Sequence, residues 1–306
     1  MTDTQYYRDI TTQKRVATLL RSEIERATNQ FFFERGFIYV DPPILHEVVP
    51  GKEREIYVSI CEKKYALAGS NALYMSAYAA EFNKVFTVSK CFRDENEQEN
   101  HLLEFSILEV EILDCALLEM LVVIEDYLRF ILQQVLKSGW IENYFDFRSR
   151  ILLLRENFDV KIIPYDQFSS NVLAENRYID ISDMDYLKIK RPKNVMIIVD
   201  YPTHCARWTS MIKGNGSSLA MNVILPELYG ELCEGCQRSN DVLILQHKIN
   251  MANAGSIQWY VDAIKKIKTN RCSFGLGMER LVRWLLGAKT ISDTKFFPRV
   301  KENENG

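Results

Sequence analysis

A charged loop between two apolar runs, at residues 92–105, is the feature of the chain that most constrains its fold. The preceding run, Lys84–Cys91, alternates in side-chain type, and the following run, Phe105–Leu113, is rich in large apolar residues, so both are predicted to be strands. This unit would present Arg93 and His101 to a polyphosphate, because guanidinium binds phosphate bidentately and a partly cationic imidazole adds charge. A solvated hairpin, whose charges keep a sheet edge soluble, is the alternative interpretation.

A second segment, far along the chain, favours the polyphosphate interpretation. Gly275 and Gly277 precede Arg280, which opens an amphipathic helix. Glycines let the backbone approach a ligand closely, and a cation at a helix start adds to the positive end of the helix dipole. Phe105, at the end of the charged loop, could then stack on a purine ring. The two segments together predict a nucleotide site.

Length and composition indicate an ordinary globular protein. The 306 residues, 47% apolar and 26% charged, can bury a sizeable core, and we expect one domain over residues 1–306. The net charge of −3 provides no global basic field that would draw nucleic acid, although a local patch for tRNA is not excluded. The start lacks an apolar signal core, and no run approaches a membrane span, so a cytoplasmic protein is predicted.

The cysteines argue against a disulfide framework. Seven are scattered through a chain of cytosolic character, and only Cys233 and Cys236 have the spacing of metal ligands. A single Cys-x-x-Cys without a second pair is a poor zinc signature. We therefore interpret these two residues as small apolar side chains in a buried strand.

The remaining periodicity predicts a sheet with helices around it in one compact domain. Residues 140–193 are irregular and end in a small basic cluster, which is interpreted as solvated surface. The expected helices are Thr12–Arg35, Ser70–Phe82 and Cys115–Leu136, and the further strands are Phe37–Val40, Tyr65–Gly69, Val195–Pro202 and Leu219–Leu225.

Several ordered motifs resemble the class II aminoacyl-tRNA synthetases, specifically the branch that handles aspartate, asparagine and lysine. The resemblance covers nearly the whole chain and implies an α+β fold, with an antiparallel sheet flanked by helices, in a homodimer whose interface includes Pro43. The matching segments are Phe33–Leu45, Phe92–Phe105, Leu225–Arg238, Trp259–Asp262, Gly275–Arg280 and Phe296–Arg299.

The resemblance also implies roles for individual residues. Arg93 would contact the ATP α-phosphate and the amino-acid carboxylate, and Arg280 would hold the γ-phosphate and stack on adenine opposite Phe105. His101 would reach the β- and γ-phosphates, and Glu95 would lie beside the adenine amino group. In addition, Glu231 would bind Mg²⁺, and the amino acid would meet Arg238, Ser70 and Gly235.

Other charged residues near these motifs have two interpretations. Glu109 and Glu111 lie on one face of a predicted strand and could equally form a surface pair, and Arg283 is interpreted as an exposed helix charge.

The chain also departs from the branch pattern, mostly around the amino acid. Ala72 replaces a glutamine after Ser70, Asn222 replaces an aspartate, Arg271–Ser273 replaces His-Gly-Gly, and Glu234–Cys236 replaces Gly-Gly-Ser. The phosphate-binding residues are kept while the substrate pocket is altered. That combination favours adenylation with a changed amino acid or a changed acceptor.

Because residues 1–306 begin almost at the first motif, we expect no N-terminal anticodon-binding barrel. The resemblance then implies an asparagine-synthetase-like ligase that adenylates aspartate or a related amino acid and transfers it to ammonia or a small amine. One alternative is a truncated asparaginyl-type synthetase that loads a tRNA, a tRNA-like molecule or a protein. Another is a non-catalytic, synthetase-like regulatory subunit.

Overall fold

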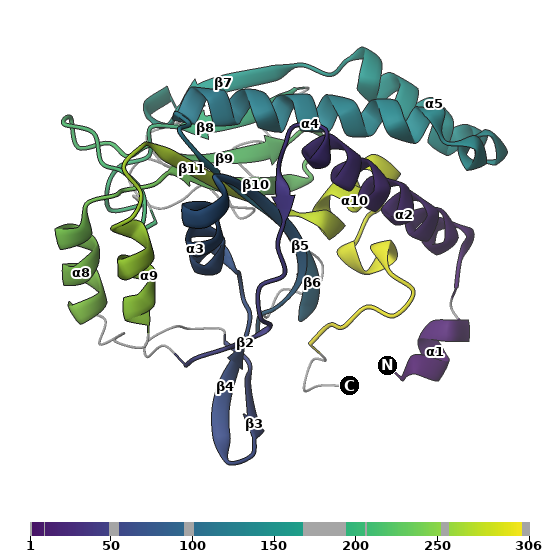
Figure 1. The fold of residues 1–306 in the computed structure, drawn as a ribbon. Helices are drawn as coiled ribbons and strands as arrows, with labels where there is room; N and C mark the ends of the chain where they lie inside the picture. The colour runs from purple at the N-terminus through teal and green to yellow at the C-terminus, as the bar shows by residue number, and fades with distance from the viewer. Residues whose placement is uncertain are drawn as a thin grey trace.

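A large, mostly antiparallel sheet is the centre of the fold (Figure 1). The computed structural model describes residues 2–8, 10–48, 55–94, 101–167, 194–205, 207–251 and 257–301. Within these residues the sheet has eight strands in the order β1-β5-β6-β11-β10-β9-β8-β7. Their bounds are β1 Ile38–Tyr39, β5 Lys84–Phe92, β6 Glu104–Leu113, β7 Val160–Pro164, β8 Val195–Val199, β9 Ala220–Leu225, β10 Gly230–Gln237 and β11 Arg271–Gly277.

The predicted sheet with flanking helices is confirmed, with parallel pairing only at the two edges. The β1–β5 and β7–β8 pairs are parallel, and the pairs between them are antiparallel. The helices are α1 Asp3–Arg8, α2 Thr12–Phe33, α3 Ala72–Phe82, α4 Leu117–Lys137, α5 Phe145–Glu156, α8 Val242–Met251, α9 Gln258–Ile264 and α10 Met278–Leu286. Short 3₁₀ turns are η1 Gly139–Asn143, η2 Tyr165–Gln167 and η5 Ile291–Thr294.

Local capping sets the ends of the two long helices. The hydroxyl of Thr11 accepts the N–H of Lys14 and starts α2, which ends two residues before the predicted Arg35. The carboxylate of Glu119 accepts the N–H of Ala116 at 2.7 Å, so α4 begins at Leu117 rather than at Cys115.

One face of the sheet is buried under α2, α4 and α10 (Figure 1). Phe31 and Phe32 of α2 pack on Tyr127 of α4 and on Phe86 of β5, with ring centroids 4.9–5.7 Å apart. Trp284 of α10 is also buried in this core. Because this face is fully covered, polar chemistry is left to the opposite face of the sheet.

Cys233 and Cys236 are both buried in β10, as the sequence predicted. Burial raises the pKa of Cys233 well above its ordinary value. All seven cysteines are free thiols.

Residues 140–193, which the sequence analysis described as irregular, begin with a regular helix and strand. Helix α5 and strand β7 lie in the first half of this segment, and β7 closes the far edge of the sheet against β8. The basic cluster, at Lys188, Lys190, Arg191 and Lys193, lies outside the described residues.

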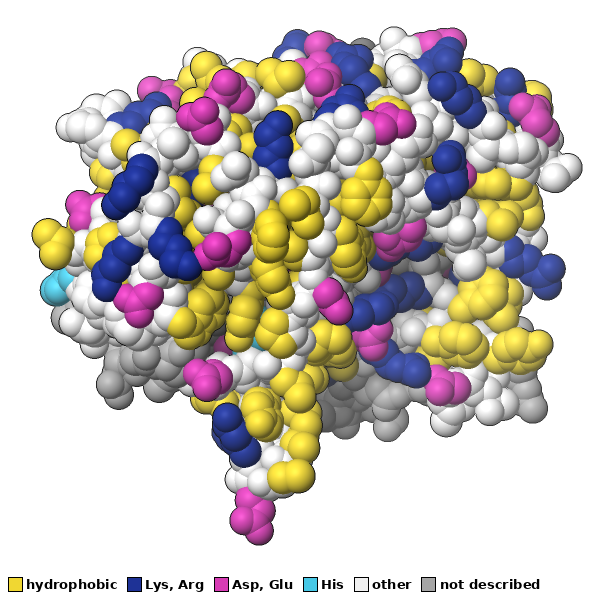
Figure 2. Space-filling view, in the orientation of Figure 1, with side chains coloured by type: hydrophobic (Ala, Val, Ile, Leu, Met, Phe, Trp, Pro, Cys, Tyr) yellow, Lys and Arg dark blue, Asp and Glu magenta, His cyan; other side chains and the backbone are white. Residues whose placement is uncertain are grey.

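A small second sheet projects from the main body (Figure 1). Its strands are β2 Leu45–His46, β3 Tyr57–Ile60 and β4 Lys63–Leu67, in the order β2-β4-β3. Figure 2 shows apolar side chains running down the middle of this view onto the projecting hairpin. No helix among the described residues is long and apolar enough to span a membrane.

A buried ion cluster ties α10 to α2 and to the segment after α10. The carboxylate of Glu279 is 3% exposed and accepts from Arg21 at 3.2 Å, Lys295 at 3.1 Å and the backbone N–H of Ser106 at 2.8 Å. Burial alone would raise the pKa of Glu279, but the two cations and the N–H hold it below its ordinary value. The cluster anchors the start of α10, where Arg280 follows Glu279.

We expect the Glu279 cluster to stabilise the fold only while its carboxylate is ionised. Because the folded-state pKa is depressed, this stabilisation is fully present above the unfolded pKa of about 4.3 and is lost as pH falls through the folded value. Glu279→Gln should lower the free energy of unfolding near neutral pH and flatten its decline on acidification, as urea titrations at several pH values would measure. A decline as steep as in the parent protein would contradict this assignment.

Candidate active site

The strand registers align polar residues on the open face of the sheet. Thr87 of β5 lies opposite Glu109 of β6, which lies opposite Gly275 of β11. Gly275 in turn lies opposite Glu234 of β10, which pairs with Asn222 of β9. Residues directly opposite in a ladder point to the same side, so this row crosses the face away from the α2–α4–α10 layer. In this row Gly275, which has no side chain, lies between the carboxylates of Glu109 and Glu234.

A bulge in β10 brings a second carboxylate to this face. The register shifts between Glu231 and Cys233, so that Leu232 and Cys233 both face the core while Glu231 and Glu234 both face the open side. In an unbroken strand, residues three apart would point to opposite faces. Sequence periodicity alone therefore could not have paired these two carboxylates.

Arg280 contacts two other residues that the sequence analysis assigned to the phosphate end of the site, Glu231 and His101. Its Nη1 donates to the backbone carbonyl of Glu231 at 2.8 Å and to the carboxylate at 3.2 Å, and its Nη2 lies 3.0 Å from Nε2 of His101. Burial raises the pKa of Glu231, and the charge of Arg280 opposes that rise. Three segments distant in sequence thus meet at Arg280.

The contact between Arg280 and His101 has a defined direction. Arginine has donors only, so Nε2 of His101 is the acceptor in this hydrogen bond.

Arg93 and Phe105 form a second pair, where the loop leaves β5 and enters β6. The guanidinium of Arg93 lies 5.3 Å from the centre of the Phe105 ring, and its Nε donates to the carbonyl of Gly69 at 3.1 Å. Both residues lie at odd-numbered positions, on the same face as Glu109. Glu95, the other residue expected in this loop, lies outside the described residues.

The surface interpretation of Glu109 and Glu111 is wrong, because they are only 3% and 0% exposed. The carboxylate of Glu109 accepts from the hydroxyl of Ser70 at 2.6 Å and from the backbone N–H of Asn71 at 2.9 Å. Burial raises the pKa of Glu109, while these donors and Arg93 lower it. Ser70, predicted to meet the amino acid, is thus tied to a carboxylate on the open face.

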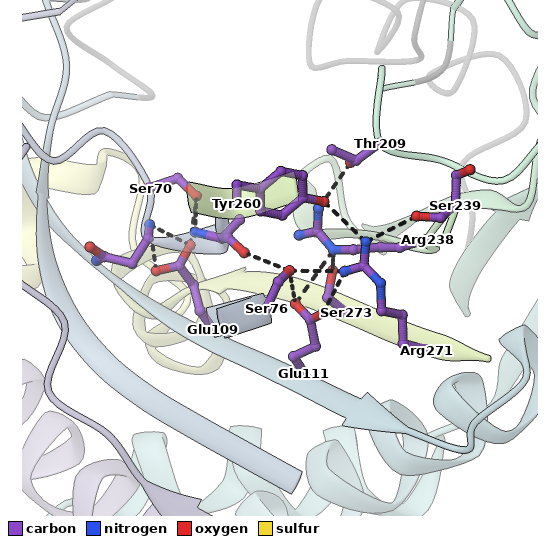
Figure 3. A network of polar contacts seen from close by, with 12 residues as sticks. Ser70, Ser76, Glu109, Glu111, Thr209, Arg238, Ser239, Tyr260, Arg271 and Ser273 are labelled. Atoms are coloured by element: carbon purple, nitrogen blue, oxygen red, sulfur yellow. Dashed lines mark hydrogen bonds and ion pairs between the residues drawn. The ribbon is translucent and has the colours of Figure 1, made fainter. Parts of the chain in front are cut away.

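Arg238 lies at the end of β10 with 7% exposure. Its Nε donates to the hydroxyl of Ser273 at 2.6 Å and lies 3.5 Å from the carboxylate of Glu111, and its Nη1 donates to the hydroxyl of Thr209 at 2.9 Å (Figure 3). The carboxylate of Glu111 holds the pKa of Arg238 above its ordinary value, against burial, which would lower it. The guanidinium is therefore a fixed cation.

The segment 207–212 covers this end of the site, and no sequence pattern indicated its position. Ser210 bridges to Arg238, and Arg207 grips both carboxylate oxygens of Glu234, with Nη2 at 2.7 Å from one of them. The Arg207–Glu234 ion pair therefore places two charged side chains at position 234, where the family pattern has a glycine. Arg207 itself is 65% exposed, so the contact is open to solvent on one side.

Three other residues singled out in the sequence have distinct surroundings. A Cβ on Gly235 would lie 2.6 Å from the carbonyl oxygen of Ser273 and from the Met221 side chain. The missing side chain therefore faces the core, and only the backbone of Gly235 can face a ligand. Pro43 is exposed beside the small sheet. Arg283, interpreted as an exposed charge, is half-buried and donates to the carbonyl of Lys289 at 2.7 Å.

The donor set of the open face suits a hard cation bound together with phosphates. Glu231 and Glu234 offer carboxylate oxygens. The side-chain amide of Asn222 offers none, because its nitrogen donates to Glu231 and its oxygen accepts from the Tyr201 hydroxyl at 2.5 Å. Across the described ranges, no three His, Cys, Asp or Glu side chains gather into a metal cluster. Mg²⁺ commonly takes one or two carboxylates and completes its shell with phosphates and waters.

The fold is that of a class II synthetase core, and the comparison with family models identifies the branch. Residues 3–301 match the family model for the class II tRNA synthetases of the D, K and N group, and the chain belongs to this family. Asparaginyl-tRNA synthetase from Pyrococcus horikoshii, solved with asparaginyl-adenylate, is similar at 25% identity and a TM-score of 0.82, over 94% of this chain and 69% of that one. Entamoeba histolytica asparaginyl-tRNA synthetase shares the fold at 18% identity and a TM-score of 0.82, over 95% and 68% of the two chains.

Proposed function

We propose that this protein is an AMP-forming ligase that activates the carboxylate of aspartate or a related amino acid and transfers it to ammonia or a small amine without tRNA. Class II tRNA synthetases are ATP-dependent ligases, which supports adenylate formation. The observation that carries the proposal is the meeting of Arg280, His101 and Glu231 on the face that also bears Arg93 and Phe105.

The ATP end of the site follows from this arrangement. Phe105 would stack on adenine, and Arg93 would hold the α-phosphate beside the substrate carboxylate. Arg280 and His101, already in contact, would take the γ- and β-phosphates. Glu95 keeps its proposed place beside the adenine amino group.

Mg²⁺ would be held by Glu231, with Glu234 close enough to assist. When bound, it would neutralise charge on the phosphates and fix their geometry. The raised pKa of Glu231 means that a cation arriving there would favour the ionised carboxylate.

The chemistry is two displacements without a covalent enzyme intermediate. A substrate carboxylate oxygen forms a bond to the α-phosphorus, and the bond from that phosphorus to pyrophosphate breaks. The amine nitrogen then bonds the activated carbonyl carbon, AMP leaves with the bridging oxygen, and the nitrogen loses a proton to solvent. The first step brings two anions together, so preorganised cations such as Arg93 supply most of the rate enhancement.

The amino-acid end would be formed by Arg238, Ser70 and the backbone of Gly235. Arg238 would grip the side chain of the substrate, because it is buried, fixed and cationic. Glu109, which the sequence left without a role, lies within reach of Ser70 and suits the α-ammonium group of an amino acid. We also propose that residues 1–306 form one catalytic domain.

Pyrophosphate exchange tests the activation step. Purified protein should incorporate labelled pyrophosphate into ATP only when its amino acid is supplied, and a panel of amino acids would identify which one. Mass spectrometry with ammonia or small amines should then find the amide product. Absence of exchange with every amino acid would reject the proposal, and absence of ATP binding would favour a non-catalytic subunit.

Transfer to tRNA is the second candidate, and the similarity to asparaginyl-tRNA synthetases favours it. The net charge of −3 gives no general attraction to a polyanion, which supports the amine instead. Labelled amino acid that becomes attached to added tRNA, rather than to ammonia, would decide for the second candidate.

We also propose a cytoplasmic homodimer. Free thiols at all seven cysteines suit a reducing compartment. Exposed apolar side chains gather around β1 and β2, and such patches commonly mark protein interfaces. They include Ile38, Tyr39, Ile44 and Leu45, next to Pro43.

Ile44→Asp should therefore convert a dimer into a monomer, since a carboxylate would be buried without a partner in the interface. Light scattering after gel filtration should give twice the chain mass for the parent protein and the chain mass for the variant. Leu243→Asp, at an 82% exposed residue of α8, is the matched control and should leave the mass unchanged. A monomeric parent protein would refute the dimer.

A further inference from the structure

Arg271, at the start of β11, is a buried arginine whose hydrogen-bonding capacity is fully used. It is 0% exposed, in a position where the family pattern has a histidine. A guanidinium has five N–H donors, and the structure supplies five acceptors. Figure 3 labels Ser76, Glu111, Ser239 and Tyr260 among them. These are Asn240 at 2.7 Å, Ser76 at 2.9 Å, Glu111 at 2.7 Å, the Ser239 carbonyl at 3.0 Å and the Tyr260 hydroxyl at 3.0 Å. Arg271 therefore has no donor left for a substrate.

Arg238 differs from Arg271 in this respect. Its Nε and one N–H of Nη1 are engaged by Ser273 and Thr209. Among the described residues, none accepts from its Nη2 or from the second N–H of Nη1. Three donors of a fixed guanidinium thus remain for a ligand.

Glu111 connects the two arginines. Its Oε1 is 2.7 Å from Nη1 of Arg271, and its Oε2 accepts from Ser76 at 2.8 Å and lies 3.5 Å from Nε of Arg238. The carboxylate is therefore paired closely with Arg271 and only loosely with Arg238. A buried carboxylate that lost Arg271 would have Arg238 as its nearest remaining cation.

We propose that Arg271 is a positioning residue for amino-acid recognition: it holds the carboxylate of Glu111, so that Arg238 keeps its free edge turned to the substrate. The inference rests on the proposed function, in which Arg238 grips the substrate side chain. Two cations around one carboxylate leave a surplus positive charge, which an anionic side chain of the substrate would offset.

The test compares Michaelis constants for the two substrates in pyrophosphate exchange. Arg271→Gln should raise the KM for the amino acid about tenfold or more, because Glu111 would then compete with the substrate for Arg238. The KM for ATP should stay within about twofold, because the ATP residues lie outside this network. Arg271→Lys keeps the charge but has three donors, so its amino-acid KM should rise about threefold or more, yet less than that of Arg271→Gln.

A double variant separates positioning from general damage. Glu111→Gln combined with Arg271→Gln removes the competing carboxylate together with its partner, and should bring the amino-acid KM back toward the parent value. A folded Arg271→Gln protein with an unchanged amino-acid KM would overturn the proposal. So would equal rises in both KM values without rescue in the double variant.

If Arg271→Gln does not fold, the same criterion applies to Arg271→Lys, and an unchanged amino-acid KM there overturns the proposal. Exchange by the parent protein keeps this outcome separate from the proposed function. A parent protein that exchanges pyrophosphate supports activation, even where the Arg271 variants contradict positioning.

Discussion

Arg93→Ala should lower amino-acid-dependent pyrophosphate exchange by about 10²–10³-fold, the usual effect of removing one preorganised donor from a transition state. The guanidinium lies beside Phe105 and within electrostatic reach of Glu109, where the α-phosphate and the attacking carboxylate would meet. Without it, two anions would approach with less compensation. Initial rates at saturating ATP and amino acid measure the effect.

Two further variants sharpen this result. Arg93→Lys keeps the charge but loses the planar fork, so its rate should fall between those of the parent protein and Arg93→Ala. Arg129→Ala removes an exposed arginine that pairs with Glu125 on α4, and should leave exchange unchanged. Exchange by Arg93→Ala within tenfold of the parent rate would contradict the charge argument.

Glu111→Ala should lower the free energy of unfolding by about 3–5 kcal/mol, the range expected when one partner of a buried ion pair is removed. The carboxylate is fully buried between Arg271 and Arg238. Its removal leaves two buried cations to repel each other and takes away the acceptor of one Arg271 N–H donor. Chemical denaturation, followed by far-UV circular dichroism, gives the value.

Glu125→Ala is the matched control for this variant. Glu125 pairs with Arg129 at 2.7 Å in a solvent-exposed i,i+4 arrangement on α4. Such pairs stabilise by less than about 0.5 kcal/mol. If Glu111→Ala lost no more stability than Glu125→Ala, the two-arginine network would not be an energetic unit.

Local pattern was enough to predict the elements that carry the proposed ATP residues. Strands β5 and β6 follow from alternation on either side of the charged loop, and α10 from the amphipathic residues after two glycines. These signals lie within about ten neighbouring residues of the chain, which is the range over which periodicity acts. For this reason the expected ends of α2 and α4 were wrong by only one or two residues.

The substrate end of the site was not predictable in this way. The sequence allowed Glu109 and Glu111 to be a surface pair, because alternation along one strand cannot show that α3 covers this part of the otherwise open face. The bulge that turns Glu231 and Glu234 to one side also breaks the period on which a sequence argument depends.

The sequence by itself determined the class of fold and the residues that would face ATP, because both depend on motifs and on short-range periodicity. Only the tertiary structure decided how the polar residues pair. Arg271 meets Glu111 across 160 residues, and Arg280 meets His101 across 179. Partners so distant are selected by strand order and by the cost of burying an unpaired charge, and neither can be read from the neighbouring residues.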